Sequence, residues 1–357
     1  MRSLDFRVNN FDFIRLLAAL QVTFIHSIYH LNIPVSKYIV DFINIFPGVP
    51  VLFFISGFLI SASFEKSDGS IRDYFLNRAL RIYPALWFCF AVSLSTVFVL
   101  YEPIFDLKNF LLWCVAQLSF FQFYNLEFLR GYGVGVLNGS LWTISVELQF
   151  YIAIPFLYFI ARKLSNNIDS VKNLYLLLVI VFFVLVFAND VYQEKDFSDK
   201  SLLSKLYAVS MIPHLYMFLF GMVIQRNLDN FFHLIENKCL FWFLNYVFLS
   251  FSLKYFGVVV AGNYINFISF LFLSIFVVSF SYSFNAALGK LLHRKDISYG
   301  IYLYHMIIIN VFVEKGYVGS YLFLLLVFLL TIVIAIFSWV CIEKPLLKLK
   351  KYSLIKD

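Results

Sequence analysis

Eleven apolar segments, most of them close to twenty residues long, follow one another along this chain with short connections between them. The segments run at about 11–31, 45–64, 83–101, 109–125, 139–161, 173–188, 205–225, 240–260, 264–284, 297–314 and 320–342. A helix needs roughly 20 apolar residues to cross a bilayer. Of the 357 residues 62% are hydrophobic and 14% charged, against about 45–50% and about 25% in soluble domains. We therefore predict an all-α integral membrane protein.

The distribution of Lys and Arg indicates how many segments cross the membrane. Segment 109–125 is short and contains Gln117 and Gln122. If it does not span and the N-terminus is cytoplasmic, the cytoplasmic side holds 19 of the 28 basic residues and the outer loops hold 8; if it spans, the division becomes 12 inside and 15 outside. Because cytoplasmic loops are enriched in Lys and Arg, we predict about ten transmembrane helices, both termini cytoplasmic, and a segment 109–125 that is re-entrant or lies along protein.

No internal repeat or long linker divides the chain, so we predict one domain over residues 1–357. The formal charge of +7 comes from residues scattered over the loops, which argues against a nucleic-acid partner. The four cysteines lie in or at the start of apolar segments without C-x-x-C spacing, and we interpret them as small apolar residues rather than as metal ligands. We therefore predict no metal site.

Ionisable side chains inside apolar segments are costly unless they face a protein interior or water, so each is a candidate functional residue. Arg15 and His26 are eleven residues apart in the first segment, about three helical turns, and so share one face. Glu147, in the stretch N-G-S-L-W-T-I-S-V-E, is predicted near the depth of His26. His305 and His214 are predicted near the middle of the membrane.

Two arginines mark the cytoplasmic side. Arg78 and Arg81 are three residues apart on one helical face of R-D-Y-F-L-N-R-A-L-R-I-Y-P. Arginine forks suit the oxygens of a pyrophosphate. A buried histidine able to act as a base, together with an inner arginine pair able to hold a phosphorylated donor, indicates a transferase that works across the membrane.

Six motifs in order resemble those of the membrane acyltransferase 3 family, which O-acetylates bacterial surface polysaccharides. They are F-D-F-I-R with His26 eleven residues beyond its Arg, G-V-P-V-L-F-F-I-S-G-F-L-I, the R-x-x-R before Tyr83-Pro84, S-L-W-T-I-S-V-E, S-Y-G-I-Y-L-Y-H and E-K-P. The resemblance runs from about Phe11 to Leu347.

This resemblance implies transfer of an acetyl group to a hydroxyl of a cell-surface or lipid-linked glycan, such as lipopolysaccharide O-antigen or exopolysaccharide, at the bacterial inner membrane. The donor is expected to be cytoplasmic acetyl-CoA, bound as a substrate rather than as a permanent cofactor. Many relatives carry an additional C-terminal esterase-like domain. This chain is expected to lack one, so a second transfer step would need a separate protein.

The resemblance and the residue pattern together assign roles to individual side chains. His26 matches the family's essential histidine and is expected to be a general base or a transient acyl carrier, with Glu147 orienting it or the sugar. Arg15, Arg78 and Arg81 match arginines associated with activity and donor binding. The supporting or acceptor-side residues are Asp12, Ser140, Trp142, Tyr302 and His305.

Each assignment has a structural alternative. The inner arginines can be topological anchors, and Trp142 can be an interface anchor. Arg15 can pair with Asp12, Glu147 can pair with a basic group, and His305 can be a polar contact in the core. We expect His214, which stands in no motif, to be structural, and Glu343 to pair with a nearby Lys or Arg.

A rival function is a proton-coupled transporter or polysaccharide exporter that uses the same buried His and Glu as a proton relay. The R-x-x-R pair and the His26 spacing have no particular purpose in such a carrier. Inverted repeats, which are typical of transporters, are not visible in the sequence.

Overall fold

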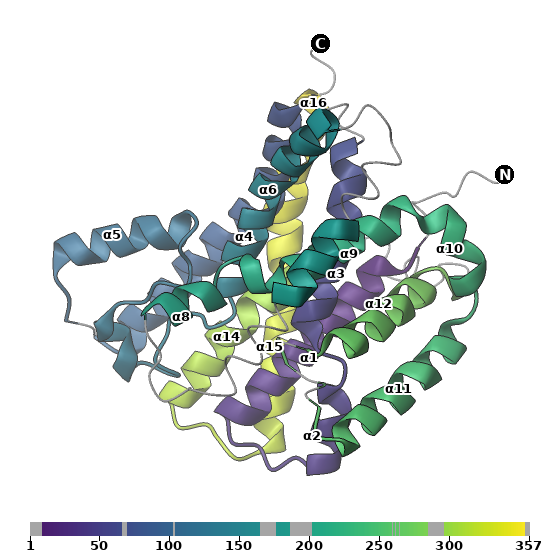
Figure 1. Cartoon of the computed structure of the whole chain (residues 1–357). Helices are drawn as coiled ribbons and strands as arrows, with labels where there is room; N and C mark the ends of the chain where they lie inside the picture. The colour runs from purple at the N-terminus through teal and green to yellow at the C-terminus, as the bar shows by residue number, and fades with distance from the viewer. Residues whose placement is uncertain are drawn as a thin grey trace. The chain divides into compact units, whose positions relative to one another are not determined.

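The computed structural model describes residues 9–65, 70–102, 104–164, 176–185, 202–258, 260, 262–263, 265–284 and 296–353. Every element in these residues is helical (Figure 1). The α-helices are α1 (Phe11–His30), α2 (Lys37–Asn44), α3 (Gly48–Glu65), α4 (Ile71–Leu100), α5 (Leu107–Leu118), α6 (Trp142–Leu164), Leu176–Leu185, α8 (Leu202–Ala208), α9 (Leu215–Arg226), α10 (Leu228–Ile235), α11 (Cys239–Tyr255), α12 (Phe267–Ser281), α14 (Ser298–Glu314), α15 (Tyr321–Ser338) and α16 (Lys344–Ser353). Shorter turns are η1 (Glu127–Gly131), η2 (Ile212–His214) and η4 (Trp339–Glu343).

Each of the eleven predicted apolar segments overlaps a helix in the described residues. In the part of the chain that the structure describes, six helical stretches are long and apolar enough to cross a membrane: Phe11–His30, Lys37–Phe64, Ile71–Leu100, Trp142–Ile160, Leu202–Arg226 and Tyr321–Leu349. The prediction of an all-α, multi-pass membrane protein is therefore confirmed, while the count of ten spans and the cytoplasmic position of both termini stay predictions. One predicted segment is interrupted, because Pro213 lies in η2 between α8 and α9.

Helix α5 covers the first part of the segment predicted not to span. Its twelve residues make a helix of about 18 Å, short of the ~30 Å hydrocarbon core. Gln117 and Gln122, both buried, each donate from Nε2 to the other's main-chain oxygen at 3.3 Å. These contacts satisfy polar groups that would be costly in lipid, which supports a segment folded against protein.

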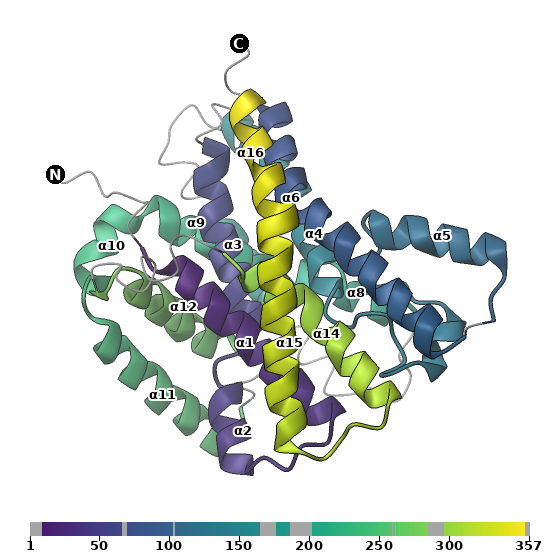
Figure 2. The same cartoon turned by 180° about the vertical axis from the view of Figure 1, so that it is seen from behind.

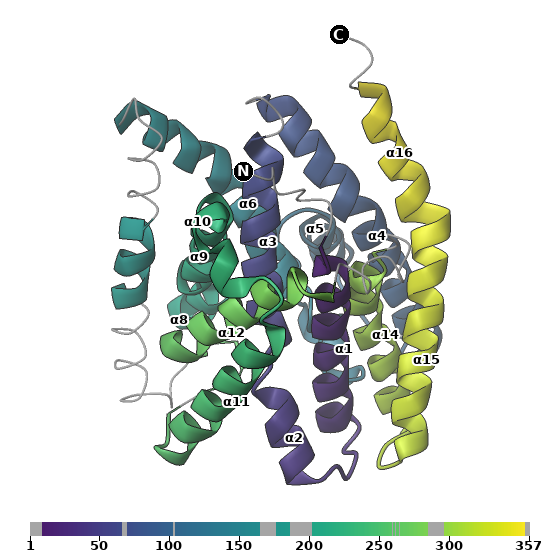
Figure 3. The same cartoon turned by 90° about the vertical axis from the view of Figure 1, so that its right-hand side faces the viewer.

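The chain forms two compact units. The first consists of residues 1–18, 44–71 and 146–294. Within it α3 and α9 lie side by side (Figure 1), and α11 packs against α12 (Figure 3). A Cβ on Gly57 would lie 2.2 Å from the main-chain oxygen of Phe218, and a Cβ on Gly221 would lie 2.3 Å from that of Phe54. The two glycines therefore let the α3 and α9 backbones touch, as small residues do in membrane helix pairs.

The second unit consists of residues 19–43, 72–145 and 295–357. Its α14 and α15 run side by side, and α15 continues through η4 into α16 (Figure 2). Helix α14 is buried along nearly its whole length. The buried residues of α15 form one stripe, Val327, Thr331, Ala335 and Ser338, at the spacing of a single helical face. A Cβ on Gly300 of α14 would lie 2.9 Å from that of Ala335, so the two helices are in close contact along this stripe.

Candidate active site

The second unit brings two of the predicted histidines into direct contact. His26 lies in the last third of α1 and His305 in the middle of α14. His26 Nδ1 is 2.9 Å from His305 Nε2, and the two ring centres are 5.1 Å apart with the planes inclined by 26°. His305 is fully buried, whereas His26 is only partly buried. The partner of the expected catalytic histidine in this unit is thus another imidazole.

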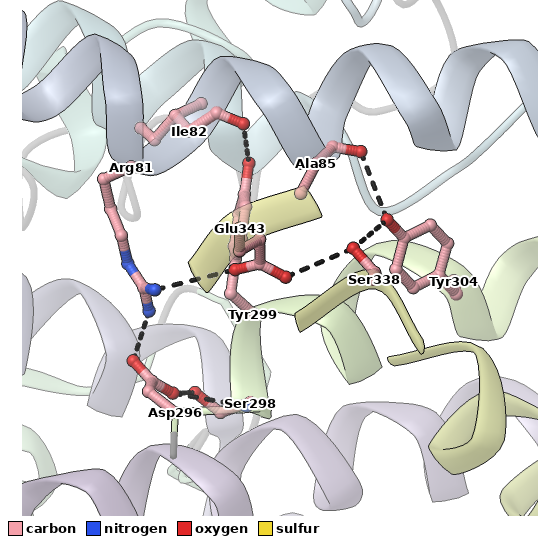
Figure 4. Close-up of polar contacts among 9 residues, drawn as sticks. All are labelled: Arg81, Ile82, Ala85, Asp296, Ser298, Tyr299, Tyr304, Ser338 and Glu343. Carbon is pink, nitrogen blue, oxygen red and sulfur yellow. Dashed lines mark hydrogen bonds and ion pairs between the residues drawn. The ribbon is translucent and has the colours of Figure 1, made fainter. Parts of the chain in front are cut away.

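Arg81, one of the two inner arginines, is held by acidic side chains (Figure 4). Its Nη2 atom forms a hydrogen-bonded ion pair with Asp296, just before α14. Its Nη1 atom lies 3.6 Å from Glu343 Oε2 at the end of η4. The guanidinium also lies 5.7 Å from the ring centre of Tyr299 and 5.8 Å from that of Trp339. The expected pairing of Glu343 with a basic residue is confirmed.

The network around Arg81 extends through hydroxyl groups. Ser338 Oγ donates to Glu343 Oε1 at 3.3 Å, and Tyr304 OH donates to Ser338 Oγ at 2.7 Å. Asp296 also accepts from the main-chain nitrogen of Ser298 at 3.2 Å, beside the start of α14. Three helical segments are thus joined by one buried polar network (Figure 4). The Arg81 guanidinium is thus the centre of this network, and donor binding by Arg81 and by Arg78, one turn earlier on α4, stays a prediction.

Ser140 belongs to a second polar cluster in the same unit. Its Oγ donates to Asn138 Oδ1 at 2.7 Å, and Asn138 Nδ2 donates to the main-chain oxygen of Leu303 at 2.8 Å. Tyr302 OH is 2.8 Å from Thr143 Oγ1. Ser140 is 1% exposed, so its hydroxyl ties the start of α6 to α14. Trp142, the first residue of α6, keeps partial exposure.

The remaining predicted residues lie in the first unit. Glu147 Oε1 accepts hydrogen bonds from Ser56 Oγ at 2.9 Å and from Tyr151 OH at 2.6 Å. Asp12 and Arg15 lie in the first turns of α1 and are partly buried. His214 is fully buried and its Nε2 is 3.3 Å from the main-chain oxygen of Ala208. This contact agrees with the structural role expected for His214, and the orientation of His26 by Glu147 stays a prediction.

Asp296 is the site residue that the sequence interpretation missed. It stands two residues before the first Ser of the S-Y-G-I-Y-L-Y-H motif, and its carboxylate accepts from the main-chain nitrogen of that Ser, Ser298. An acidic residue at that position before an apolar helix is a recognisable helix-start signal. Within the described residues no group of three or more His, Cys, Asp or Glu side chains is arranged to hold a metal ion.

Comparison with known proteins decides the family. The profile of the family described as "Acyltransferase domain" matches residues 8–343, nearly the whole chain. This protein belongs to the membrane acyltransferase 3 family. It is therefore a membrane enzyme that transfers acyl groups, and the acyltransferase chemistry expected from the six motifs is confirmed.

Three curated proteins illustrate the relationship. "Nodulation protein 10" of Rhizobium leguminosarum bv. viciae is 30% identical over 96% of this chain and 94% of its own length. "Peptidoglycan O-acetyltransferase OatA" of Listeria monocytogenes is 27% identical over 45% of this chain and 25% of its own length. "O-acetyl transferase" of Shigella phage Sf6 is 32% identical over 40% and 44%. No solved structure matches the chain.

Proposed function

We propose that this acyltransferase is an O-acetyltransferase of the bacterial inner membrane that moves an acetyl group from cytoplasmic acetyl-CoA to a hydroxyl of a cell-surface or lipid-linked glycan. Two relatives are named as O-acetyltransferases, which supports acetyl as the group transferred. The single observation on which the chemistry depends is the contact of the partly buried His26 with the fully buried His305.

His26 is the general base in this reaction. As the acceptor oxygen attacks the thioester carbonyl carbon of acetyl-CoA, its proton passes to His26. The carbon–sulfur bond then breaks, and the CoA thiolate leaves and takes the proton from His26. The alternative of a transient acyl-histidine uses the same ring and gives the same products.

The arginines and the acceptor-side residues complete the proposed site. Arg78 and Arg81 bind phosphate oxygens of the donor, and Arg15 stabilises negative charge on the donor or on the tetrahedral intermediate. Glu147, whose Oε1 atom already holds two hydroxyl groups, orients His26 or the sugar. Trp142 and Tyr302 support the acceptor.

Mass spectrometry of surface glycans tests the proposal. Matched cells would carry wild-type protein, His26→Ala, His30→Ala or no copy of the gene. His30 is the matched control because it lies one turn further along α1 and is exposed. We expect a mass increase of one acetyl group per modified sugar with wild type and with His30→Ala, and none with His26→Ala at equal protein level.

Two outcomes would contradict this assignment. Glycan acetylation with His26→Ala equal to that with wild type would show that His26 is not the general base. Equal acetylation in all four strains, with a changed amount of polymer outside the cell, would instead identify the rival function, an exporter that uses the buried His and Glu as a proton relay.

A further inference from the structure

The contacts of His305 fix the position of its ring proton. His305 Nδ1 is 3.2 Å from the main-chain oxygen of Ile301, one turn earlier on α14. A carbonyl oxygen can only accept, so the ring nitrogen facing it must carry the hydrogen. The carbonyl has two lone pairs and can accept this bond beside its helical one. His305 Nδ1 is therefore a donor.

The same ring is neutral. It is 0% exposed, and within the described residues no carboxylate pairs with it. Burying an unpaired charge is very unfavourable. With one proton, on Nδ1, the ring presents a lone pair at Nε2, and the neighbouring His26 Nδ1 at 2.9 Å must donate to it.

We infer that His305 is a positioning residue that holds His26 in the Nδ1–H tautomer, so that His26 Nε2 is the nitrogen that takes the proton from the acceptor hydroxyl. This inference rests on the proposed function. The difference in burial fits the division of roles, because His26 keeps partial exposure and His305 has none. His305 acts through His26 and does not itself touch substrate.

The pair replaces the carboxylate that orients histidine in many hydrolytic triads. When His26 takes the proton, its Nδ1–H bond to His305 becomes charge-assisted and stronger. The acceptor here is a neutral imidazole, so the cation on His26 gains less stabilisation than it would from a carboxylate. His26 can then return the proton readily to the departing thiolate.

Two variants of His305 separate positioning from packing. His305→Gln offers an amide oxygen that can accept from His26 Nδ1, whereas His305→Leu fills a similar volume and accepts nothing. Met306→Leu, a volume-conserving change at the next buried position of α14, is the matched control. Acetyl transfer from acetyl-CoA would be measured with each full-length protein in lipid.

We expect His305→Leu to lower kcat about 10²-fold, since general-base catalysis contributes roughly 10²–10⁴, with both KM values unchanged. His305→Gln should recover most of that loss, and Met306→Leu should match wild type. Full kcat in His305→Leu, or no recovery in His305→Gln, would overturn the inference.

A spectroscopic measurement is independent of catalysis. Nitrogen-15 NMR of histidine-labelled protein distinguishes protonated from unprotonated ring nitrogens, and the difference from His26→Asn assigns the His26 signals. We expect the proton on His26 Nδ1 in wild type and His305→Gln, and a mixture of tautomers in His305→Leu. A proton on His26 Nε2 in wild type would overturn the inference, even if His305→Leu does not fold.

The outcomes also separate this inference from the function on which it rests. Activity in His26→Ala contradicts the proposed function itself. An inactive His26→Ala protein together with a fully active His305→Leu protein contradicts only the positioning role.

Discussion

Arg81 Nη1 lies 3.6 Å from Glu343 Oε2, and the Glu343 side chain there is 2% exposed. A carboxylate so deeply buried is tolerated as an ion only beside a cation. The second carboxylate on the same guanidinium, that of Asp296, is 10% exposed. Both acidic groups therefore depend on Arg81, which gives this arginine a structural role in addition to its proposed role in donor binding.

Replacing Arg81 by Met should destabilise the protein strongly. The substitution leaves two buried carboxylates without their cation, at a cost of about 3–5 kcal/mol. The thermal unfolding of purified protein in detergent would measure the loss. Arg78→Met should raise the KM for acetyl-CoA.

A second substitution tests whether the unpaired carboxylates cause the loss of stability in Arg81→Met. Adding Glu343→Gln to Arg81→Met removes one of the stranded charges and keeps an oxygen that can accept from Ser338, so it should restore part of the stability. If the double variant is no more stable than the single one, the ion pair with Glu343 is not what Arg81 contributes.

Ser140→Ala should affect stability rather than acceptor binding. The hydroxyl is buried and donates to Asn138 at 2.7 Å, and a typical hydrogen bond is worth about 1 kcal/mol. We expect a lower unfolding temperature with an unchanged acceptor KM. A raised acceptor KM at unchanged stability would instead place the Ser140 hydroxyl on the substrate.

Gly57→Ala should disrupt the first unit even though alanine is the better helix former by roughly 1 kcal/mol. The added methyl group would lie 2.2 Å from the Phe218 carbonyl oxygen, and backbone cannot move aside cheaply. We expect a low yield of folded protein in size-exclusion chromatography. Gly139→Ala is the control, because its methyl group would meet its nearest neighbour at 3.5 Å; equal yields would argue against close helix contact.

Asn310→Ala should release the loop that precedes α6. Asn310 Oδ1 accepts from Val134 N at 3.0 Å, and its Nδ2 donates to the oxygens of Val136 and Leu137 at 3.0 and 2.9 Å. Hydrogen–deuterium exchange should therefore increase over 133–137 while α14 stays protected. Unchanged exchange in the loop would mean that other contacts hold it.

The helices could be predicted from sequence because apolar length is a local property. Segments 11–31 and 297–314 were predicted nearly residue for residue as α1 and α14. The start of α4 was placed twelve residues too late, because its first turns are polar and carry arginines. The two compact units could not be foreseen, since each is assembled from separate stretches of chain.

The site was predictable where a motif places a residue and less so where distant residues meet. Sequence spacing identified His26 and His305 separately, but only folding shows that their rings are bonded. The pairing of Glu343 with a basic residue was expected, yet its partner Arg81 is 262 positions away. These two acidic partners of Arg81 were not foreseen, since neither Asp296 nor Glu343 adjoins it in the chain.

The turn of π-helix at Trp339–Glu343 determines which side chains of the following helix, α16, face the protein interior. The buried stripe of α15 ends at Ser338 and on a regular helix would continue at position 342. The wider turn moves that inward direction on by one residue, about 100° around the axis, and delivers Glu343 instead. Deleting a single residue here would rotate Glu343 away from Arg81 and turn the polar face of α16 by the same angle. The π-helical turn that ends at the glutamate of the E-K-P motif thus fixes the rotation of α16 about its axis, and the number of residues in this turn matters as much as their side chains.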